Sequence, residues 1–152
     1  MTGRPRTQAT LAFALAFAIV LTIGGCAFVR FAVHGTPPAV VERSTLPACG
    51  QESTDQTDGY DVVARQCFWT AYLQGRPAEF MTTRLSIEGD PITWIYRVLS
   101  PGHLEVFIDS TQDRYSPRTW LKLTCSTLGL IDAGLVTPDF GPDDSCTETT
   151  IG

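Results

Sequence analysis

The sequence predicts an α+β domain: one N-terminal helix packed on a four-stranded antiparallel meander sheet, braced by disulfides and preceded by a signal or anchor segment. Three observations lead to this fold class. An uncharged apolar run stands near the start of the chain, and a helical period of apolar residues, then a period of two, follow further on. The third observation is an even set of four cysteines beyond the apolar run.

Length and charge limit the organisation of the chain. Of its 152 residues, the part that follows the apolar start and a polar linker is long enough for one hydrophobic core. We therefore expect a signal or anchor at 1–26, a linker at 27–48 and one domain at 49–152. All sixteen Asp and Glu but only nine Lys and Arg lie beyond residue 26, which gives that part a net charge of −7. Such a surface repels nucleic acid, which is excluded as a partner.

The first thirty residues predict export and attachment to a membrane. Arg4 and Arg6 precede the apolar run, which is the layout of an export signal. The run ends in Ile23-Gly24-Gly25-Cys26, which resembles the lipobox of bacterial lipoproteins. That resemblance implies cleavage before Cys26 and lipidation of its thiol by diacylglycerol.

Two alternatives to a lipid anchor stay open. Residues 10–29 form a stretch of twenty residues that, as a helix, would span about 30 Å of bilayer hydrocarbon, and the chain stays apolar after Cys26. An uncleaved anchor is therefore the second possibility, and a cleaved secreted form is the third. The first two share one topology, in which membrane lipid is a partner of the N-terminus and the domain lies outside the cytoplasm.

The predicted domain begins with a linker, a loop and a helix. The segment from His34 to Pro47 contains three prolines and no clear period, and predicts a stiff extended linker. Residues 49–57 are polar and are expected to form a loop. A helix is then expected from about residue 59 to 74, with Asp58 as its N-cap and a stop signal at Gly75.

Alternation of apolar and polar residues after the helix predicts the sheet. Beyond Leu128 the chain is rich in Gly, Pro and Asp, and is expected to be irregular, with room for one last short strand. The expected strands lie near residues 81–87, 92–99, 103–109 and 119–126.

The turn at Pro101-Gly102 leaves two strand registers open. A loop of only these two residues would turn Arg97 into the core. A loop that includes His103 would leave Arg97 outside, diagonal to Glu105. We expect the second register, because burial of an unpaired guanidinium costs several kcal/mol.

Four cysteines, Cys49, Cys67, Cys125 and Cys146, are expected to form two disulfides. No pair has the C-x-x-C spacing of a zinc or thioredoxin-like site, so no metal or other cofactor is expected. In the expected register Cys67 and Cys125 both face inward, which favours a Cys67–Cys125 bond, with Cys49–Cys146 tying the ends. Shorter loops would favour Cys49–Cys67 and Cys125–Cys146, and the sequence leaves this choice open.

The outer face of the predicted sheet is the leading candidate for a binding surface. Ile95, Arg97, Phe107 and Trp120 are expected on this face, and exposed aromatic residues among charges are typical of protein recognition. The alternative is that another segment of the chain, such as residues 128–146, covers the same face.

Two weaker candidates combine a turn with titratable groups. Glu88 and Asp90 flank a glycine, and two close carboxylates could share a proton or hold a cation. His103 and Glu105 could carry out acid–base chemistry, although no nucleophile motif accompanies them. Ordinary turn residues are the simpler interpretation of both.

Several short stretches resemble a family of uncharacterised bacterial lipoproteins. They are ARQCFW at 64–69, GRPAEF at 75–80, IEGDPI at 87–92 and YRV at 96–98. The resemblance covers residues 48–126 and implies export. The family has no assigned activity, so the resemblance transfers no catalytic residue.

Two hypotheses about function follow. The leading one is a membrane-tethered, non-enzymatic binding or accessory module with a protein partner at the outer surface. The alternative is a small hydrolase or small-ligand-binding domain with a pocket between helix and sheet, using His103, Glu105 or Asp109.

Overall fold

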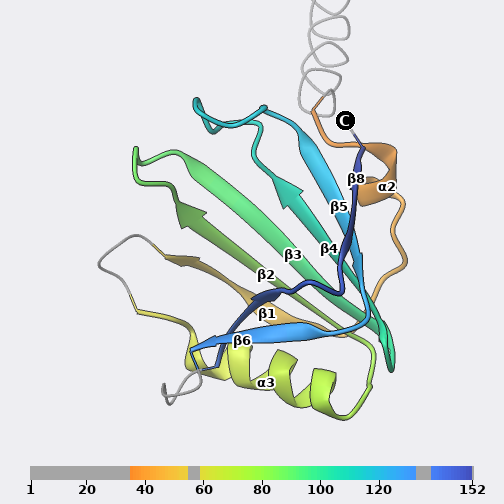
Figure 1. The fold of residues 1–152 in the computed structure, drawn as a ribbon. Coiled ribbons are helices and arrows are strands. Elements are labelled where there is room, and N and C mark those ends of the chain that lie inside the picture. Colours follow the sequence, from red (N-terminus) through yellow and green to blue (C-terminus); the bar gives the residue numbers. More distant parts are fainter. Residues whose placement is uncertain (1–34, 55–58, 133–137, 152) are drawn as a thin grey trace, which may run out of the picture. The chain divides into compact units, whose positions relative to one another are not determined.

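The computed structural model describes residues 35–54, 59–132 and 138–151 (Figure 1). The chain divides into two units, Met1–Thr36 and Pro37–Gly152, and the description below concerns the second. The predicted export signal and its lipidation site, Cys26, lie outside the described residues.

The second unit consists mostly of β-structure. A six-stranded sheet has the order β1-β2-β3-β4-β5-β8, and a separate two-stranded ribbon pairs β6 with β7. The predicted α+β layout with a four-stranded sheet is therefore wrong, since the described chain holds eight strands and two short helices. The elements are α2 (Pro38–Val41), β1 (Ala48–Thr54), α3 (Val62–Leu73), β2 (Ala78–Leu85), β3 (Pro91–Ser100), β4 (His103–Asp109), β5 (Trp120–Cys125), β6 (Leu128–Asp132), β7 (Asp139–Pro142) and β8 (Thr147–Thr150).

Strand β1 lies where a loop was expected. It pairs in parallel with β2, and α3 forms the crossover between the two strands. Its inward-facing positions carry Glu52 and Thr54, so the apolar alternation that identifies a half-buried strand is missing. The sheet is mixed for this reason, with one parallel pair at its edge and antiparallel pairs elsewhere.

The N-cap of helix α3 lies three residues later than predicted. Asp61, not Asp58, is its N-cap, and the Asp61 side chain accepts a hydrogen bond of 3.0 Å from the backbone N–H of Ala64. The predicted end is confirmed, because Gly75 adopts a φ of +62° just after the last turn. A Cβ at this position would lie 2.5 Å from Pro101, so the close approach of the β3–β4 turn also requires glycine.

A β-bulge resolves the register at Pro101-Gly102. Ser100 pairs with His103, so the turn is the two-residue loop that we had set aside. The pairing then shifts between Val98 and Ser100, and Arg97 comes directly opposite Glu105. The expected register is wrong, but the bulge restores the expected faces, because one extra residue reverses which side of the sheet each side chain occupies.

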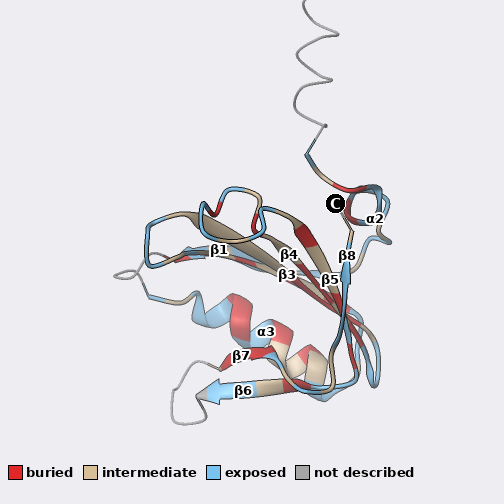
Figure 2. Cartoon of the chain, turned by 45° about the horizontal axis from the view of Figure 1, so that its top comes forward, coloured by how far each residue is buried: buried red, intermediate tan, exposed pale blue. Residues whose placement is uncertain are grey.

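Helix α3 and the β6–β7 ribbon cover one face of the sheet, here called the inner face (Figure 2). Phe68 from α3 lies at the centre of this core and is fully buried. Its ring centroid lies 5.2 Å from that of Phe140 on β7 and 5.9 Å from that of Phe80 on β2. Residues beyond Leu128, which were expected to be irregular, thus complete the main core.

The opposite, outer face is covered by the segment Pro37–Pro47, here called the strap. Val40 on α2 is buried against Ile95, Phe107 and Trp120. An extended linker was expected here, but Pro38–Val41 is helical and packed. Proline at the first helical position is compatible with this turn of helix, because its missing N–H has no intrahelical partner there.

Two disulfides join Cys49 to Cys67 and Cys125 to Cys146, so the prediction of two bonds is confirmed. The favoured pairing, Cys67–Cys125 with Cys49–Cys146, is wrong, and the alternative based on shorter loops is correct. Phe68 enters the core, whereas the neighbouring Cys67 is exposed. Cys67 therefore lies beside the edge strand β1, which carries its partner Cys49. Each bridge therefore joins elements that are close in sequence.

Candidate ligand-binding site

Among the residues that the structure describes, those that cover the inner face leave one end of the sheet uncovered. Glu52, Thr82, Trp94, Ile108 and Leu121 form one row across five neighbouring strands. Thr82 is buried, whereas Trp94, Ile108 and Leu121 are only half-buried. In Figure 1, the sheet extends beyond α3 and β6 at this end. We call the three half-buried residues the open row.

A buried group of charges, here called the Arg65 cluster, borders the open row. Arg65 on α3 is fully buried, and its Nε donates to both carboxylate oxygens of Glu52 at 3.0 Å. Its Nη1 donates to Oδ1 of Asp139 on β7 at 3.0 Å. Arg84 on β2 donates from Nη2 to the same oxygen at 2.9 Å. The ring of Tyr60 lies 3.9 Å from the Arg65 guanidinium carbon and completes the cluster.

The cluster is electrically balanced, with two guanidinium groups facing two carboxylates. Such pairing is required, because an isolated charge would be very costly to bury. Burial alone would raise the pKa of Asp139, but its hydrogen bonds to Arg84 and Arg65 hold that pKa below its ordinary value. Glu52 also accepts a hydrogen bond of 2.8 Å from Thr82, so both carboxylates are held in place.

Arg84 keeps unused hydrogen-bonding capacity. Its side chain is 28% exposed, and Nη2 is the one guanidinium nitrogen for which the described residues supply a hydrogen-bond partner. Nε is buried, so a ligand could reach only the Nη nitrogens. Arg84 lies diagonally across the β2–β3 pair from Trp94, on the same face. A guanidinium with spare donors thus stands beside an aromatic and aliphatic surface.

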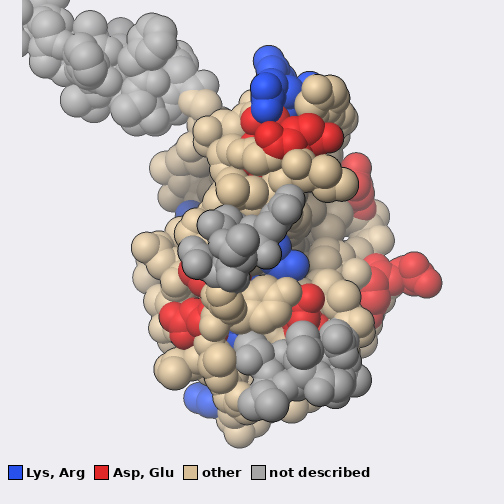
Figure 3. All heavy atoms as spheres, turned by 90° about the vertical axis from the view of Figure 1, so that its left-hand side faces the viewer, with Lys and Arg blue, Asp and Glu red and all other residues tan. Residues whose placement is uncertain are grey.

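Figure 3 looks onto the side of the molecule that lies at the left of Figure 1. Acidic groups lie at several separate places on this side, and basic groups are scattered among them, at the top of the domain and at its lower edge. The described residues visible on this face therefore form no extended single-sign patch that would select a highly charged partner.

The four residues of the predicted binding surface are buried. Ile95, Arg97, Phe107 and Trp120 are between 1% and 7% exposed. The strap supplies Val40 to cover them, and Met81 and Ile151 pack at the margin. The alternative prediction was that another segment of the chain covers the outer face. A cover is present, but it comes from the strap and Ile151 and not from residues 128–146. The prediction of a protein partner itself stays a prediction.

Arg97 is buried but fully paired, which the argument from desolvation alone did not anticipate. Its Nε donates to Glu79 at 3.0 Å, and its Nη1 donates to Glu105. Its Nη2 donates to the backbone oxygen of Ser44 in the strap. Arg43, also in the strap, donates to Glu79 at 2.8 Å, so this Arg97 cluster fastens the strap to the sheet.

The residues considered for acid–base chemistry are not brought together. His103 is exposed at the turn, and the Glu105 carboxylate is bound by Arg97 and Lys122 on the outer face. Asp109 accepts hydrogen bonds from Thr111. None of these side chains faces the space between α3 and the sheet.

The turn carboxylates are likewise separated. Asp90 is paired with Arg114 at 2.9 Å, and the hydrogen bonds from Arg114 lower the pKa of Asp90. Glu88 instead accepts a hydrogen bond of 3.1 Å from Ser86. Among the described residues, no group of three or more His, Cys, Asp or Glu could hold a metal ion.

Sequence reasoning missed the Arg65 cluster, although one signal was present. Arg65 stands three residues before Phe68, on the side of the helix that the apolar residues predict to be buried. A charge at a buried helical position calls for a partner. The partner Glu52 lies in a polar stretch with no apolar pattern, and Asp139 lies 74 residues away in sequence.

No protein-family model, curated protein or solved structure matches this chain. Within the described ranges, no helix has the length and apolar character needed to cross a membrane.

Proposed function

We propose that this chain is a membrane-tethered binding domain that works outside the cytoplasm and takes an uncharged ligand at the open row. Its role is recognition rather than catalysis. The observation that carries this proposal is the position of Arg84, whose partly exposed guanidinium stands at the edge of a half-buried aromatic and aliphatic surface.

The charge balance of the Arg65 cluster supports an uncharged ligand. Arg65 and Arg84 are already matched by Glu52 and Asp139, so an added carboxylate would face two existing carboxylates without a free cation. A carbonyl oxygen satisfies an N–H donor without adding charge. The ligand class is therefore a neutral molecule that has an amide or ester carbonyl and an apolar group to lie against Trp94.

Saturation-transfer NMR on the full chain in lipid nanodiscs tests this site, with N-acetylphenylalanine amide as the water-soluble probe. We expect saturation transfer to the probe ring. Trp94→Ala should abolish it by removing the aromatic surface, and Arg84→Lys should weaken it while keeping a positive charge beside Asp139. Tyr115→Ala is the matched control, because Tyr115 is an exposed aromatic residue elsewhere, at 76% exposure. Equal transfer with empty nanodiscs, or full transfer in Trp94→Ala, would rule out the open row as a binding site.

The location outside the cytoplasm is supported by the two disulfides, which form and persist in oxidising compartments. The tether rests on the sequence alone. We propose a lipoprotein whose signal peptide is removed and whose Cys26 carries the lipid, and the resemblance to uncharacterised bacterial lipoproteins agrees with it. Intact mass spectrometry of the membrane-extracted protein, with and without reduction, tests the cleavage before Cys26, the lipid on Cys26 and the number of disulfides. A full-length mass without lipid would contradict the lipoprotein and leave the uncleaved anchor.

A further inference from the structure

The two disulfides close similar stretches of chain but differ in exposure. Cys49 and Cys67 are separated by 18 positions, and Cys125 and Cys146 by 21, so both bonds constrain the unfolded chain to a similar extent. Cys67 is exposed on the outer side of α3, whereas Cys125 is only 3% exposed within the core. Cys49 and Cys146 are both half-buried, so the two bonds differ in accessibility through Cys67 and Cys125 and not through loop length.

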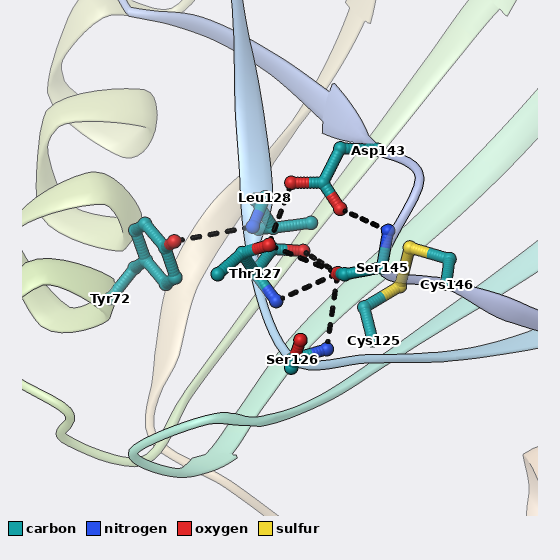
Figure 4. The surroundings of a disulfide bond; sticks show 8 residues. All are labelled: Tyr72, Cys125, Ser126, Thr127, Leu128, Asp143, Ser145 and Cys146. Carbon is teal, nitrogen blue, oxygen red and sulfur yellow. Dashed lines mark hydrogen bonds between the residues drawn. A yellow bond between two sulfur atoms is a disulfide. The ribbon is translucent and has the colours of Figure 1, made fainter.

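The surroundings of the two bonds strengthen this difference. Cys67 lines an open cavity of about 500 Å³, which a reagent can enter. The bond at Cys125 lies beneath a hydrogen-bonded turn (Figure 4). There, Ser145 Oγ accepts from the backbone N–H of Thr127 at 3.0 Å, and Asp143 accepts from the backbone N–H of Ser145 at 2.9 Å.

The exposed bond also holds the two elements that carry the Arg65 cluster. Cys49 lies on β1 three residues before Glu52, and Cys67 lies on α3 two residues after Arg65. Strand β1 is an edge strand, paired on one side only, with β2. The bond to α3 is therefore a principal restraint on the position of Glu52 relative to Arg65.

We propose that the Cys49–Cys67 disulfide is a thiol–disulfide exchange site for a dithiol oxidoreductase outside the cytoplasm, and that its opening loosens the Arg65 cluster. A thiolate of the reductant attacks Cys67 Sγ, the disulfide bond breaks, and Cys49 leaves as a thiolate. The second thiol of the reductant then attacks the mixed disulfide and releases Cys67. Two electrons pass to the two cysteines, and the reductant ends as a disulfide. The second part of the proposal rests on the proposed function, because the Arg65 cluster borders the ligand site.

Differential alkylation tests the exchange site. The full chain in nanodiscs is treated with dithiothreitol for increasing times, free thiols are blocked with iodoacetamide, and peptides are mapped by mass spectrometry. We expect Cys49–Cys67 to open at least about tenfold faster than Cys125–Cys146, because access controls the rate. In urea the two rates should converge, since the loops are of similar length. Equal rates in the folded protein, or faster opening of Cys125–Cys146, would overturn the proposal.

Hydrogen exchange tests the coupling. After selective reduction and alkylation, amides of β1 and the first turn of α3 should exchange at least about tenfold faster, while β4 and β5 stay protected. The double variant Cys49→Ala/Cys67→Ala should show the same pattern without alkylation. Unchanged exchange in β1 would refute the coupling. Neither measurement uses a ligand, so failure of the probe to bind the open row would count against the proposed function alone.

Discussion

Each face of the sheet buries one arginine, but the two sites differ in how much of each partner is buried. On the inner face, Arg65 is paired with Glu52, whose side chain is 3% exposed and has no second cation. On the outer face, Arg97 is paired with Glu79 and Glu105, which are 21% and 12% exposed. Glu79 also pairs with Arg43, and Glu105 with Lys122. On the inner face, Asp139 is shared by Arg65 and Arg84, but among the described residues Glu52 has Arg65 as its only cation. On the outer face, Glu79 and Glu105 each have two cations.

The largest difference is expected from removing each arginine. Arg65→Met should cost about 3–5 kcal/mol, because it leaves Glu52 buried without a cation. Arg97→Met should cost less, about 1–3 kcal/mol, because Arg43 and Lys122 stay with its former partners. Urea unfolding of both variants measures the difference. Equal costs would mean that the outer network does not share its charges.

The apolar side chains of the two faces should be more alike. Phe107→Ala on the outer face should destabilise the domain by about 3–5 kcal/mol, as expected for a fully buried aromatic residue. Phe68→Ala on the inner face is the matched comparison, since both side chains are at most 1% exposed. If the Phe107→Ala variant had wild-type stability, Phe107 would not be a core residue, and it would again be a candidate for an accessible binding surface.

A smaller effect should come from the strap. Val40→Ala should cost about 1.5 kcal/mol, because it removes two buried methyl groups worth about 0.8 kcal/mol each. The neighbouring Val41→Ala is an ideal control, because Val41 is 58% exposed and should change the free energy of unfolding very little. Thermal unfolding of the two variants side by side compares them. A similar loss of stability in both variants would indicate that α2 stabilises the domain through its helical turn and not through the packing of Val40 on the outer face.

The smallest effect should be the response to acid, in which the two faces agree in sign. The folded pKa of Glu79 and that of Asp139 both lie below their ordinary values of 4.5 and 3.8. Their stabilisation is therefore complete above about pH 5 and is lost as the pH falls through the folded pKa values. Glu79→Gln and Asp139→Asn should each flatten the loss of stability below about pH 4.5, in urea titrations at each pH. Unchanged slopes in both variants would contradict the ion pairs.

The central part of the fold could be predicted because its signals are local. The strands from β2 to β5 follow apolar alternation, and the end of α3 is marked by Gly75. Strand β1 could not be found in the same way, because Glu52 faces inward and is stabilised by Arg65, a contact that no periodicity encodes. The bulge at Leu99 was also invisible, since one extra residue leaves the alternation on each side intact.

The candidate site was hidden for a related reason. Its charged residues come from β1, α3, β2 and β7, and tertiary structure alone brings them together. On the outer face, the sequence predicted an exposed binding surface where the structure has a buried cluster. The register put Phe107 and Trp120 on the correct side of the sheet, but the Pro-rich strap gave no sign that it would pack over them.

The outer face also brings together two parts of the domain that lie far apart in sequence. Val40 comes from α2, whereas Ile151, which packs at the same cluster, lies 111 positions further along the chain. The backbone N–H of Ile151 donates to Trp120 at 3.0 Å. The outer cluster can therefore close only once β8 has paired with β5, because that pairing brings Ile151 to the margin of the cluster.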